Sequence, residues 1–511
     1  MLQVLLDTDV ILDVLLKREE YYALSVSVLN LCSDHLIKGW ITVDSYISIC
    51  SVLKQKNLNH LSKSLLDNEL SFLSIIPIRH QTILDAHKLA LTNFNDCLKI
   101  ISAKDLNIDY IITRNISAYK MFEFRVKLPS DFIKEYTGNT LYQDDKKYVF
   151  VDLKAQYHQI YNQIDNQLGK VLNETAFVKG KYVVEFEKNF ANYCKAKHCV
   201  GVGNGTDALF IALKSLNISL GDEVIVPANS FIATSEAVTM AGARVVFVDC
   251  DPDTYNIDVN LIEAKINHKT KAIIPVHLYG QPANMPDIYR IAKKNNLKII
   301  QDCAQAHGAT YDGNPLIYYG DILCFSFYPG KNLGAYGDAG AVVTNNDVIA
   351  NRAFMFANHG RIDKYNHEFE GVNSRMDGIQ GAVLNIKLNY IDQWNENRIK
   401  KALLYNELLK EVNSITRPYS LPNVKHVYHL FVIRLKQRDE LRAHLNNNNI
   451  STGIHYPIAL PNLKAYAYLD HKPSDFPVAS QYQNEILSLP LYPEISDEVI
   501  RSISKTIADF I

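Results

Sequence analysis

The sequence predicts an α/β protein that is built from more than one domain. Its 511 residues exceed what one compact core usually accommodates. Short apolar runs such as "DEVIVPA" (222–228) and "LKIIQDCA" (297–304) alternate with helical stretches, which favours a mostly parallel sheet buried on both faces. The composition also changes near residue 140, because the part before it is rich in Leu, Ile, Ser and Asn and poor in Gly.

The predicted elements form three domains and one linker. Residues 1–136 begin with a short strand, continue with helices and reach a second strand at "YIITRN" (110–115), which is a small α/β pattern. The segment "TGNTLYQDDKK" (137–147) is polar and rich in turn residues, as expected of a linker. Residues 148–385 carry the alternating strands and helices of a large domain. Over 386–511, a long helix, the strand "VYHLFVIRL" and further helices predict a small α+β domain.

Composition and charge exclude several classes of function. Hydrophobic residues make up 47% of the chain, charged residues 21%, and the formal net charge is -2, so bulk electrostatic capture of nucleic acid or of an anionic membrane is not expected. The eight cysteines include no CxxC pair, which favours reduced thiols and a cytoplasmic location. Acidic residues interrupt the apolar N-terminus, and no run of about 18 apolar residues occurs, so we expect neither a signal peptide nor a membrane span.

Two motifs of the large domain place polar groups directly after strands. In "GVGNGTDALFIAL" (201–213), Gly205 and Thr206 begin a predicted helix, where backbone amides and a hydroxyl can hold a phosphate. In "IIQDCAQAHGA" (299–309), Asp302 follows an apolar strand, so we expect it at the edge where open α/β sheets bind ligands. Taken alone, the first motif is equally explained by a capped turn, and the second is better explained by a helix cap.

A glycine-rich loop carries a single lysine. In "FSFYPGKNLGAYGDAGA" (325–341), Lys331 follows a strand, where partial desolvation lowers the pKa of a lysine and makes it nucleophilic toward carbonyls. Ser326 adds a hydroxyl for a phosphate. A lone loop lysine is usually a surface residue, but a phosphate cradle, a strand-end Asp and a loop Lys in this order are the parts that a pyridoxal 5′-phosphate site needs. Phe231, which follows another strand, is placed to stack on the cofactor ring.

Residues 148–511 resemble the DegT-type sugar nucleotide aminotransferases, which have the aspartate-aminotransferase fold (fold type I). The matching stretches follow one another along this whole part of the chain: "FVDLKAQY", "FVKGKYVVEFEKNFANYC", "GNGTDALFIALKSLNISLGDEVIVPANSFIATSEAV", "VVFVDCDPDTYNID", "KAIIPVHLYGQPANM", "QDCAQAHGA", "FSFYPGKNLGAYGDAGAVVT", "GVNSRMDGIQGAVL" and "GIHYPIALP". The resemblance is strongest to the branch that aminates C3 of dTDP-linked 3-keto-6-deoxyhexoses, whose lysine loop also reads FYPGKNLGA.

The resemblance implies a role for individual residues. Lys331 matches the Schiff-base lysine, Asp302 the partner of the pyridine nitrogen, and Gln305 the residue near the ring hydroxyl. The other matches are the ring-stacking Phe231, the phosphate contacts Gly205, Thr206 and Ser326, and Asn373, which reaches the phosphate of the neighbouring subunit. The match of Asn373 implies a homodimer with shared active sites.

The activity implied by the resemblance is transamination of a nucleotide-linked keto-sugar. L-glutamate is the expected amino donor, a dTDP-3-keto-6-deoxyhexose the expected acceptor, and Lys331 the group that moves the proton. A C4 aminotransferase acting on a UDP-keto-sugar is the alternative. A dehydratase of the same fold is disfavoured because a histidine replaces the Schiff-base lysine in that branch, and a non-enzymatic sensor is disfavoured because every cofactor position is present.

Two departures from the branch concern the expected sugar pocket. Adjacent histidines usually precede "NSR", where this chain has Asn366 and His367, and a histidine is common after "HYP", where it has Pro461. These differences leave aminotransfer intact and leave the identity of the sugar open. Tyr328, His367 and His455 are candidate substrate-binding residues, with packing or structural hydrogen bonding as the alternative.

The N-terminal part resembles a PIN domain, the fold of toxin-type metal-dependent ribonucleases. The resemblance covers roughly residues 1–136 and rests on "LLDTDVILDVLLKRE", "NFNDCLKIISAKDLNIDYIITRN" and "LPSDFIK". Such nucleases hold Mg²⁺ or Mn²⁺ with three or four carboxylates. Asp7 and Asp96 match two of these acids, whereas Ser48, Asn93 and Ala118 stand where others are usual.

Two carboxylates alone would hold a hard cation weakly, so a degenerate domain is expected. Asp9 or Asp13 could compensate in part, although Asp13 is expected to cap a helix or face solvent. The favoured hypothesis is an interaction or dimerisation module. A weak RNase, or a fusion of two independent halves, are the alternatives.

Overall fold

The computed structural model describes residues 2–34, 36–58, 65, 70–89, 93–119, 124–136 and 148–511. The predicted linker, 137–147, lies outside these residues. The chain divides into two compact units, residues 1–145 and 146–511, and each is considered separately below.

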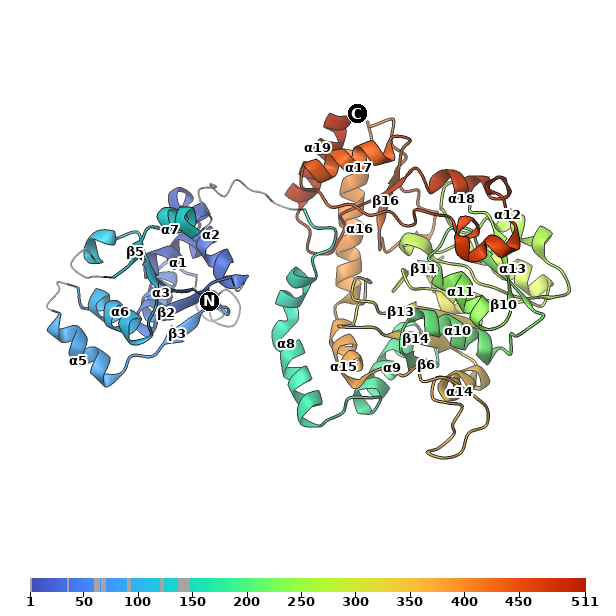
Figure 1. Ribbon diagram of the computed structural model, residues 1–511, viewed down its shortest axis with the longest axis horizontal. Coiled ribbons are helices and arrows are strands. Elements are labelled where there is room, and N and C mark those ends of the chain that lie inside the picture. The colour runs from blue at the N-terminus through green and yellow to red at the C-terminus, as the bar shows by residue number, and fades with distance from the viewer. Residues whose placement is uncertain are drawn as a thin grey trace. The chain divides into compact units, whose positions relative to one another are not determined.

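The described residues of the first unit contain a five-stranded parallel sheet in the order β3-β2-β1-β4-β5 (Figure 1). The central strand β1 is buried over Val4–Leu6, as its apolar sequence predicts. The strands are β1 (Gln3–Leu6), β2 (Lys38–Thr42), β3 (Ser74–Ile76), β4 (Tyr110–Ile112) and β5 (Val126–Lys127). The helices are α1 (Thr8–Leu15), α2 (Glu19–Ser33), α3 (Val43–Gln55), α5 (His80–Lys88), α6 (Phe94–Asp105), η2 (Ile116–Tyr119) and α7 (Pro129–Tyr136).

The second unit contains a seven-stranded sheet in the order β6-β14-β13-β10-β9-β7-β8. Its strands are β6 (His198–Val202), β7 (Glu223–Pro227), β8 (Arg244–Val248), β9 (Thr270–Ile273), β10 (Lys298–Asp302), β13 (Ile322–Ser326) and β14 (Gly340–Thr344). Only β14 runs against its neighbours, β6 and β13, and the other pairs are parallel. The mostly parallel sheet predicted from the apolar runs is therefore present. The C-terminal ends of the six parallel strands lie at one edge.

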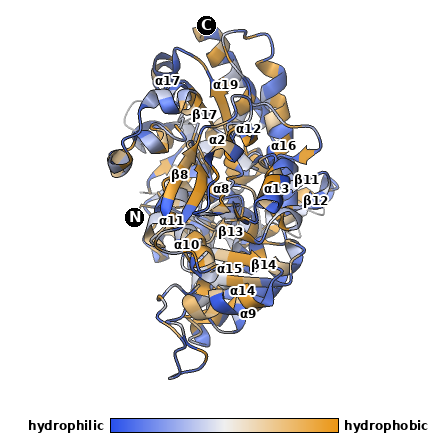
Figure 2. Ribbon diagram, turned by 90° about the vertical axis from the view of Figure 1, so that its right-hand side faces the viewer, coloured by the Kyte–Doolittle hydropathy of each residue, from blue (hydrophilic) through white to orange (hydrophobic). Residues whose placement is uncertain are grey.

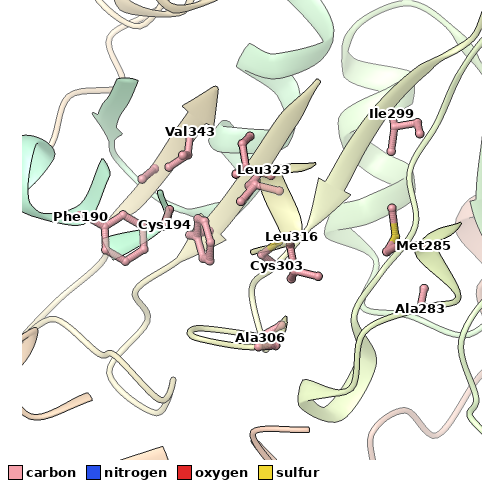
Figure 3. Packing of buried hydrophobic residues seen from close by; sticks show 14 of the residues in the cluster. Phe190, Cys194, Ala283, Met285, Ile299, Cys303, Ala306, Leu316, Leu323 and Val343 are labelled. Carbon is pink, nitrogen blue, oxygen red and sulfur yellow. The ribbon is translucent and has the colours of Figure 1, made fainter. Parts of the chain in front are cut away.

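Helices cover both faces of this sheet because alternate strand residues point to opposite sides. Leu323 and Val343 pack with Phe190 in one buried cluster, whereas Ile322 and Val342 pack in the other. Figure 3 shows part of the first cluster, and Figure 2 shows β8 and β14 in the hydrophobic colour. The helices of this part are α8 (Leu153–Asn173), α9 (Lys181–Tyr193), α10 (Gly205–Ser215), α11 (Ala233–Met240), α12 (Val259–Ile262), η3 (Glu263–Lys265), η4 (Leu278–Gly280), α13 (Met285–Lys294), η5 (Leu316–Tyr319), α14 (Asp347–Phe356) and α15 (Gly378–Lys387).

The C-terminal part of the second unit has its own core, beginning with the long helix α16 (Ile391–Leu408). Strands β16 (Phe431–Arg434) and β17 (Ile486–Leu489) pair antiparallel, and Ile500, Ile503 and Ile507 form the buried stripe of the last helix, α19 (Asp497–Phe510). The remaining elements are β11 (Thr310–Tyr311), β12 (Asn314–Pro315) and β15 (Val424–Lys425), which form a small sheet, and α17 (Arg438–Asn447), η6 (Leu460–Asn462), η7 (Lys464–Leu469), η8 (Pro473–Asp475) and α18 (Pro477–Tyr482). Among the described residues, no helix combines the length and apolar character needed to cross a bilayer.

Candidate active site

The sheet edge at the ends of β6, β10 and β13 brings together residues that are far apart in the sequence. Gly205 begins α10 directly after β6, Asp302 is the last residue of β10, and Ser326 is the last residue of β13. Because these strands are parallel to one another, their C-terminal ends meet at the edge where such sheets bind ligands. Lys331 lies on the loop that leaves this edge.

The loop that carries Lys331 is held from several sides. Asn332 donates from Nδ2 to Asn395 Oδ1 at 2.9 Å and to the Val427 carbonyl at 3.2 Å. The buried Lys387 donates to the Gly334 carbonyl at 2.8 Å, and the Tyr336 amide donates to Gln380 Oε1 at 2.9 Å. These contacts fix the backbone on the C-terminal side of Lys331 and so limit where its amine can reach.

Lys331 and Asp302 are coupled electrostatically. Burial lowers the pKa of the Lys331 ammonium below its ordinary value, and the negative charge of Asp302 opposes this shift. Asp302 is only 6% exposed, and burial raises the pKa of its carboxyl group. Its Oδ1 accepts from the Ala304 amide at 3.1 Å and its Oδ2 from Thr234 Oγ1 at 2.8 Å. These bonds, together with the charge of Lys331, favour the ionised carboxylate.

Gln305 and Phe231 both lie beside Tyr456. Gln305 accepts from the Tyr279 amide at 2.6 Å and donates to the Tyr456 hydroxyl at 3.1 Å. Phe231 is 52% exposed, and its ring centroid lies 5.6 Å from that of Tyr456. An aromatic ring with a free face beside a polar amide suits the binding of a flat heteroaromatic group.

The N-terminus of α10 approaches Ser326 closely. Asn204 caps the helix by accepting from the Asp207 amide at 2.8 Å, which leaves the amides of Gly205 and Thr206 to point out of the helix end. A Cβ atom on Gly205 would lie 2.6 Å from Ser326 Cβ, so only glycine fits there. The structure thus brings Gly205, Thr206 and Ser326 together, as the phosphate-site prediction requires.

A hairpin at residues 358–373 begins and ends near this helix. Asn373 is exposed and pairs with Asn358, and Ser374, the next residue, donates to Asp207 Oδ2 at 2.6 Å and accepts from the Gly203 amide at 3.0 Å. His367 lies in the exposed part of the hairpin together with Asn366, and its Nδ1 lies 2.7 Å from the His359 carbonyl oxygen. The contacts of His367 are thus made within its own hairpin.

His455 lies near Lys331, whereas Tyr328 points outward. The His455 ring stacks on Phe150 with a centroid distance of 5.7 Å, and its Nδ1 lies 2.8 Å from Ser488 Oγ. Burial and the positive charge of Lys331 lower the pKa of His455 to about 4. Tyr328 is 59% exposed, and Pro461 is buried in η6.

Two further histidines, His307 and His429, lie within reach of the charge of Lys331. His307 is fully buried between Phe325 and Phe327, and the charge of Lys331 adds to the burial that lowers its pKa to about 3. His429 Nδ1 lies 3.0 Å from Asn332 Oδ1. The sequence could have indicated His307, because it follows Asp302 by five residues in the motif "IIQDCAQAHGA". His429 reaches the site only through the tertiary fold.

In the first unit, Asp7 and Asp96 meet as predicted, but around a lysine. Lys99 contacts both carboxylates, and Tyr119 hydroxyl lies 3.3 Å from an oxygen of each. Among the described residues, no group of three or more His, Cys, Asp or Glu side chains is placed to hold a metal ion.

The expectation that Asp13 caps a helix or faces solvent is wrong. Its side chain is fully buried, accepts from Ser25 Oγ at 3.1 Å, and pairs with Arg18 at 3.2 Å and Arg114 at 3.3 Å. The two arginines and the hydroxyl offset the cost of burying the charge, and Arg114 comes from a distant part of the chain. Asn93, which replaces an expected acid, instead caps α6 by accepting from the Asn95 amide at 3.1 Å.

The family models and relatives agree with this division of the chain. Residues 158–508 match the model of the DegT/DnrJ/EryC1/StrS aminotransferase family, and residues 3–117 match that of a PIN domain. A dTDP-3-amino-3,6-dideoxy-alpha-D-galactopyranose transaminase from Aneurinibacillus thermoaerophilus is 45% identical over 358 residues, which cover 70% of this chain and 98% of that protein. A UDP-N-acetyl-3-dehydro-alpha-D-glucosamine 3-aminotransferase from Acidithiobacillus ferrooxidans is 41% identical over 357 residues, which cover 70% of this chain and 96% of that protein.

A solved structure matches over the same part. The X-ray crystal structure of DesV from S. venezuelae in complex with a ketimine intermediate is 40% identical in sequence to this chain and superposes with a TM-score of 0.70. The match covers 71% of this chain and 98% of the DesV chain. With the site geometry, these matches show that the chain belongs to the DegT/DnrJ/EryC1/StrS aminotransferase family, whose members use pyridoxal 5′-phosphate.

Proposed function

We propose that the chain transfers the amino group of L-glutamate to C3 of a dTDP-linked 3-keto-6-deoxyhexose, giving a dTDP-3-amino-3,6-dideoxyhexose. The observation that carries the aminotransfer is the coupling of Lys331 with Asp302 at one sheet edge. The dTDP-sugar is supported by the 45% identity to a transaminase of that substrate class. A UDP-linked 3-keto-sugar is the second candidate, because a relative named for such a substrate is 41% identical over a similar length.

The residues at this edge fit pyridoxal 5′-phosphate. Gly205, Thr206 and Ser326 offer two amides and two hydroxyls at a helix N-terminus, which suits a phosphate. The buried Asp302 carboxyl, which accepts hydrogen bonds from the Ala304 amide and Thr234, lies at a strand end where a carboxylate would suit a protonated ring nitrogen.

The proposed chemistry divides between the cofactor and the chain. When bound, pyridoxal 5′-phosphate carries the amino group from donor to acceptor and delocalises the negative charge that develops on carbon. Lys331 accepts the proton from Cα of the donor and later delivers a proton to the sugar carbon, and its lowered pKa raises the fraction of neutral amine that can do so. Glutamate leaves as 2-oxoglutarate before the sugar reacts, so ping-pong kinetics are expected.

Asp302→Asn is expected to lower kcat/KM by about 100-fold, because a charge-assisted hydrogen bond contributes about 2–3 kcal/mol. The amide keeps the size of the carboxylate and removes the charge that would hold a protonated ring nitrogen. Steady-state kinetics with glutamate measure the effect, and absorbance reports whether the cofactor stays bound. Asp321→Asn is the matched control. Asp321 directly precedes β13, so it lies at the edge of the sheet opposite to Asp302. Equal losses in both variants would contradict the role of Asp302.

The substrate is tested with a panel of dTDP- and UDP-linked keto-sugars and glutamate. Products are identified by mass and NMR, which locate the new amino group at C3 or C4. We expect amination at C3 of the dTDP-3-keto-6-deoxyhexoses. Preferential amination of a UDP-linked sugar would replace the proposed substrate, and a cofactor-loaded protein that aminates no keto-sugar would refute the proposal.

The proposed assembly is a homodimer in which each site takes Asn373 from the partner subunit. This proposal is supported by the position of Asn373, which is exposed at the base of the hairpin. The next residue, Ser374, donates a hydrogen bond to Asp207 in the first turn of α10. Asn373→Asp would place a negative charge beside the phosphate, and Lys331→Ala removes the reactive amine. We expect each variant to be nearly inactive alone.

Mixing the two variants as subunits is expected to restore activity. A mixed dimer holds one site with both defects and one with neither, so random mixing should return about a quarter of the native activity. Sedimentation gives the oligomeric state in the same samples. A monomer, or a mixture as inactive as its components, would contradict shared sites.

A further inference from the structure

The carboxylates at the edge of the sheet in the first unit surround a lysine. Asp7 follows β1, and Asp96 and Lys99 lie one turn apart on α6. Lys99 Nζ is in hydrogen-bond contact with Asp7 Oδ1 and lies 3.7 Å from Asp96 Oδ1. Asp7, Asp96 and Lys99 are all 6–7% exposed, so water does little to screen this contact. The second oxygen of Asp7 accepts from Thr113 Oγ1 at 2.7 Å.

A further acid acts on the same lysine. The negative charge of Asp44, in the first turn of α3, reaches Lys99 together with those of Asp7 and Asp96. Burial alone would lower the pKa of the Lys99 ammonium, but these carboxylates raise it above its ordinary value. Lys99 therefore forms ion pairs with two carboxylates, those of Asp7 and Asp96. Asp44 lies one turn before Ser48 on α3, so this helix does supply a carboxylate, although Ser48 stands where an acid is usual.

The neighbouring carboxylates are also paired with side-chain cations. Arg114 Nε lies 3.5 Å from Asp9 Oδ2 and 3.3 Å from Asp13 Oδ2. Arg18 completes the pairing of Asp13 at 3.2 Å. The acids of this edge thus share three cations that the chain itself supplies: Lys99, Arg114 and Arg18.

An ammonium among these oxygens excludes a hard divalent ion. Mg²⁺ and Mn²⁺ need several oxygen ligands at about 2.0–2.2 Å, and here Asp7 is already engaged by Lys99 and Thr113. A second cation inside the cluster would also be repelled by the fixed charge of Lys99 across a poorly screened distance.

We propose that Lys99 is the built-in counter-ion of this acidic cluster and takes the place of a divalent metal. The charge of the acidic cluster is then balanced without a metal ion, and the first unit lacks the ion that a carboxylate-based nuclease needs to activate water. This favours an interaction module over a metal-dependent RNase for the N-terminal part. The inference does not depend on the aminotransferase assignment of the second unit.

Replacing Lys99 by methionine tests the proposal, because methionine fills a similar volume without the charge. The full chain and the Lys99→Met variant are titrated with Mn²⁺, and bound ion is measured by electron paramagnetic resonance. We expect no binding at this site in the native chain and one additional bound Mn²⁺ per chain in Lys99→Met. Lys104→Met is the matched control, since Lys104 is an exposed lysine on the same helix.

Hydrogen exchange across residues 94–105 shows whether the first unit stays folded. Lys99→Met is expected to exchange faster without metal and to regain protection with Mn²⁺. The double variant Lys99→Met/Asp7→Asn removes a cation and an anion together, so it should stay protected and bind no Mn²⁺. Mn²⁺ binding by the native chain that Asp7→Asn abolishes would overturn the proposal. A folded Lys99→Met variant that binds no Mn²⁺ would also overturn it.

Discussion

Lys331→Ala is expected to lower transamination by about 10⁴-fold, the upper end of what a positioned acid–base group contributes. The alanine cannot take the proton from the donor, and it cannot bond to the cofactor. The visible absorbance of the lysine-bound cofactor should therefore vanish as well. The site around residue 331 is otherwise held by Asn332, Lys387 and Gln380, so the fold should be unchanged by circular dichroism.

A small primary amine added to the Lys331→Ala variant should restore part of the activity, because it can enter the space left by the side chain. Lys400→Ala, an exposed lysine on α16, is the matched control and should retain native kinetics. If the visible absorbance survives in Lys331→Ala, the lysine that bonds the cofactor is another residue. Activity that is unaffected by the substitution would lead to the same conclusion.

Acidification below pH ~6.5 is expected to destabilise the second unit by at least about 4 kcal/mol per pH unit, because three fully buried histidines alone each contribute about 1.4 kcal/mol per pH unit. Burial lowers the pKa of His277 to about 4 and those of His307 and His426 to about 3. These values lie below the unfolded value of about 6.5, so the unfolded chain binds more protons than the folded one. The stability is therefore fully present above pH ~6.5 and is lost as the pH falls toward ~4.

In addition to burial, hydrogen bonds to His277 and His426 favour the neutral form of these two rings. The Ala283 amide donates to Nδ1 of His277 at 3.0 Å, and the Tyr428 amide donates to Nδ1 of His426 at 3.1 Å. A proton added to Nδ1 of His277 or to Nδ1 of His426 would face a backbone N–H group instead of a hydrogen-bond acceptor. His277→Gln should therefore make the fall in stability less steep, whereas His158→Gln, at an exposed position, should not.

The two tryptophans of the chain make this measurement specific. Trp40 belongs to the first unit and the buried Trp394 to the second, so in a Trp40→Phe variant the fluorescence reports the second unit alone. Urea unfolding at several pH values between ~7 and ~5 then gives the change in the free energy of unfolding per pH unit. A midpoint that does not change over this range would contradict neutral, buried imidazoles.

The sequence predicts the arrangement at the sheet edge because local patterns decide it. A parallel strand that ends in Asp302, another that ends in Ser326 and a helix that begins at Gly205 must present these residues at the same edge. Their chemical roles remain predictions, since the geometry brings the residues together without showing the reaction. The parallel sheet itself follows from the consecutive apolar residues of its strands.

The residues that the sequence did not indicate depend on contacts between distant segments. His429 meets Asn332 across about a hundred residues, and Arg114 neutralises Asp13 from the other end of the first unit. No periodicity or motif encodes such pairs. Lys99 was visible as a charged residue on α6, but that the helix turns it toward Asp7 appears only in the fold.

The antiparallel strand β14 has a consequence for the order of folding. It lies between β6 and β13 and pairs with both, so within the sheet it connects the strand that precedes Gly205 with the strand that ends at Ser326. Gly205 and Ser326 are separated by roughly 120 residues of chain. Joining such distant segments carries a loop-closure entropy cost that slows folding. The phosphate end of the site therefore forms only after residues 340–344 have inserted, so in a refolding experiment cofactor capture should lag behind the appearance of helical structure.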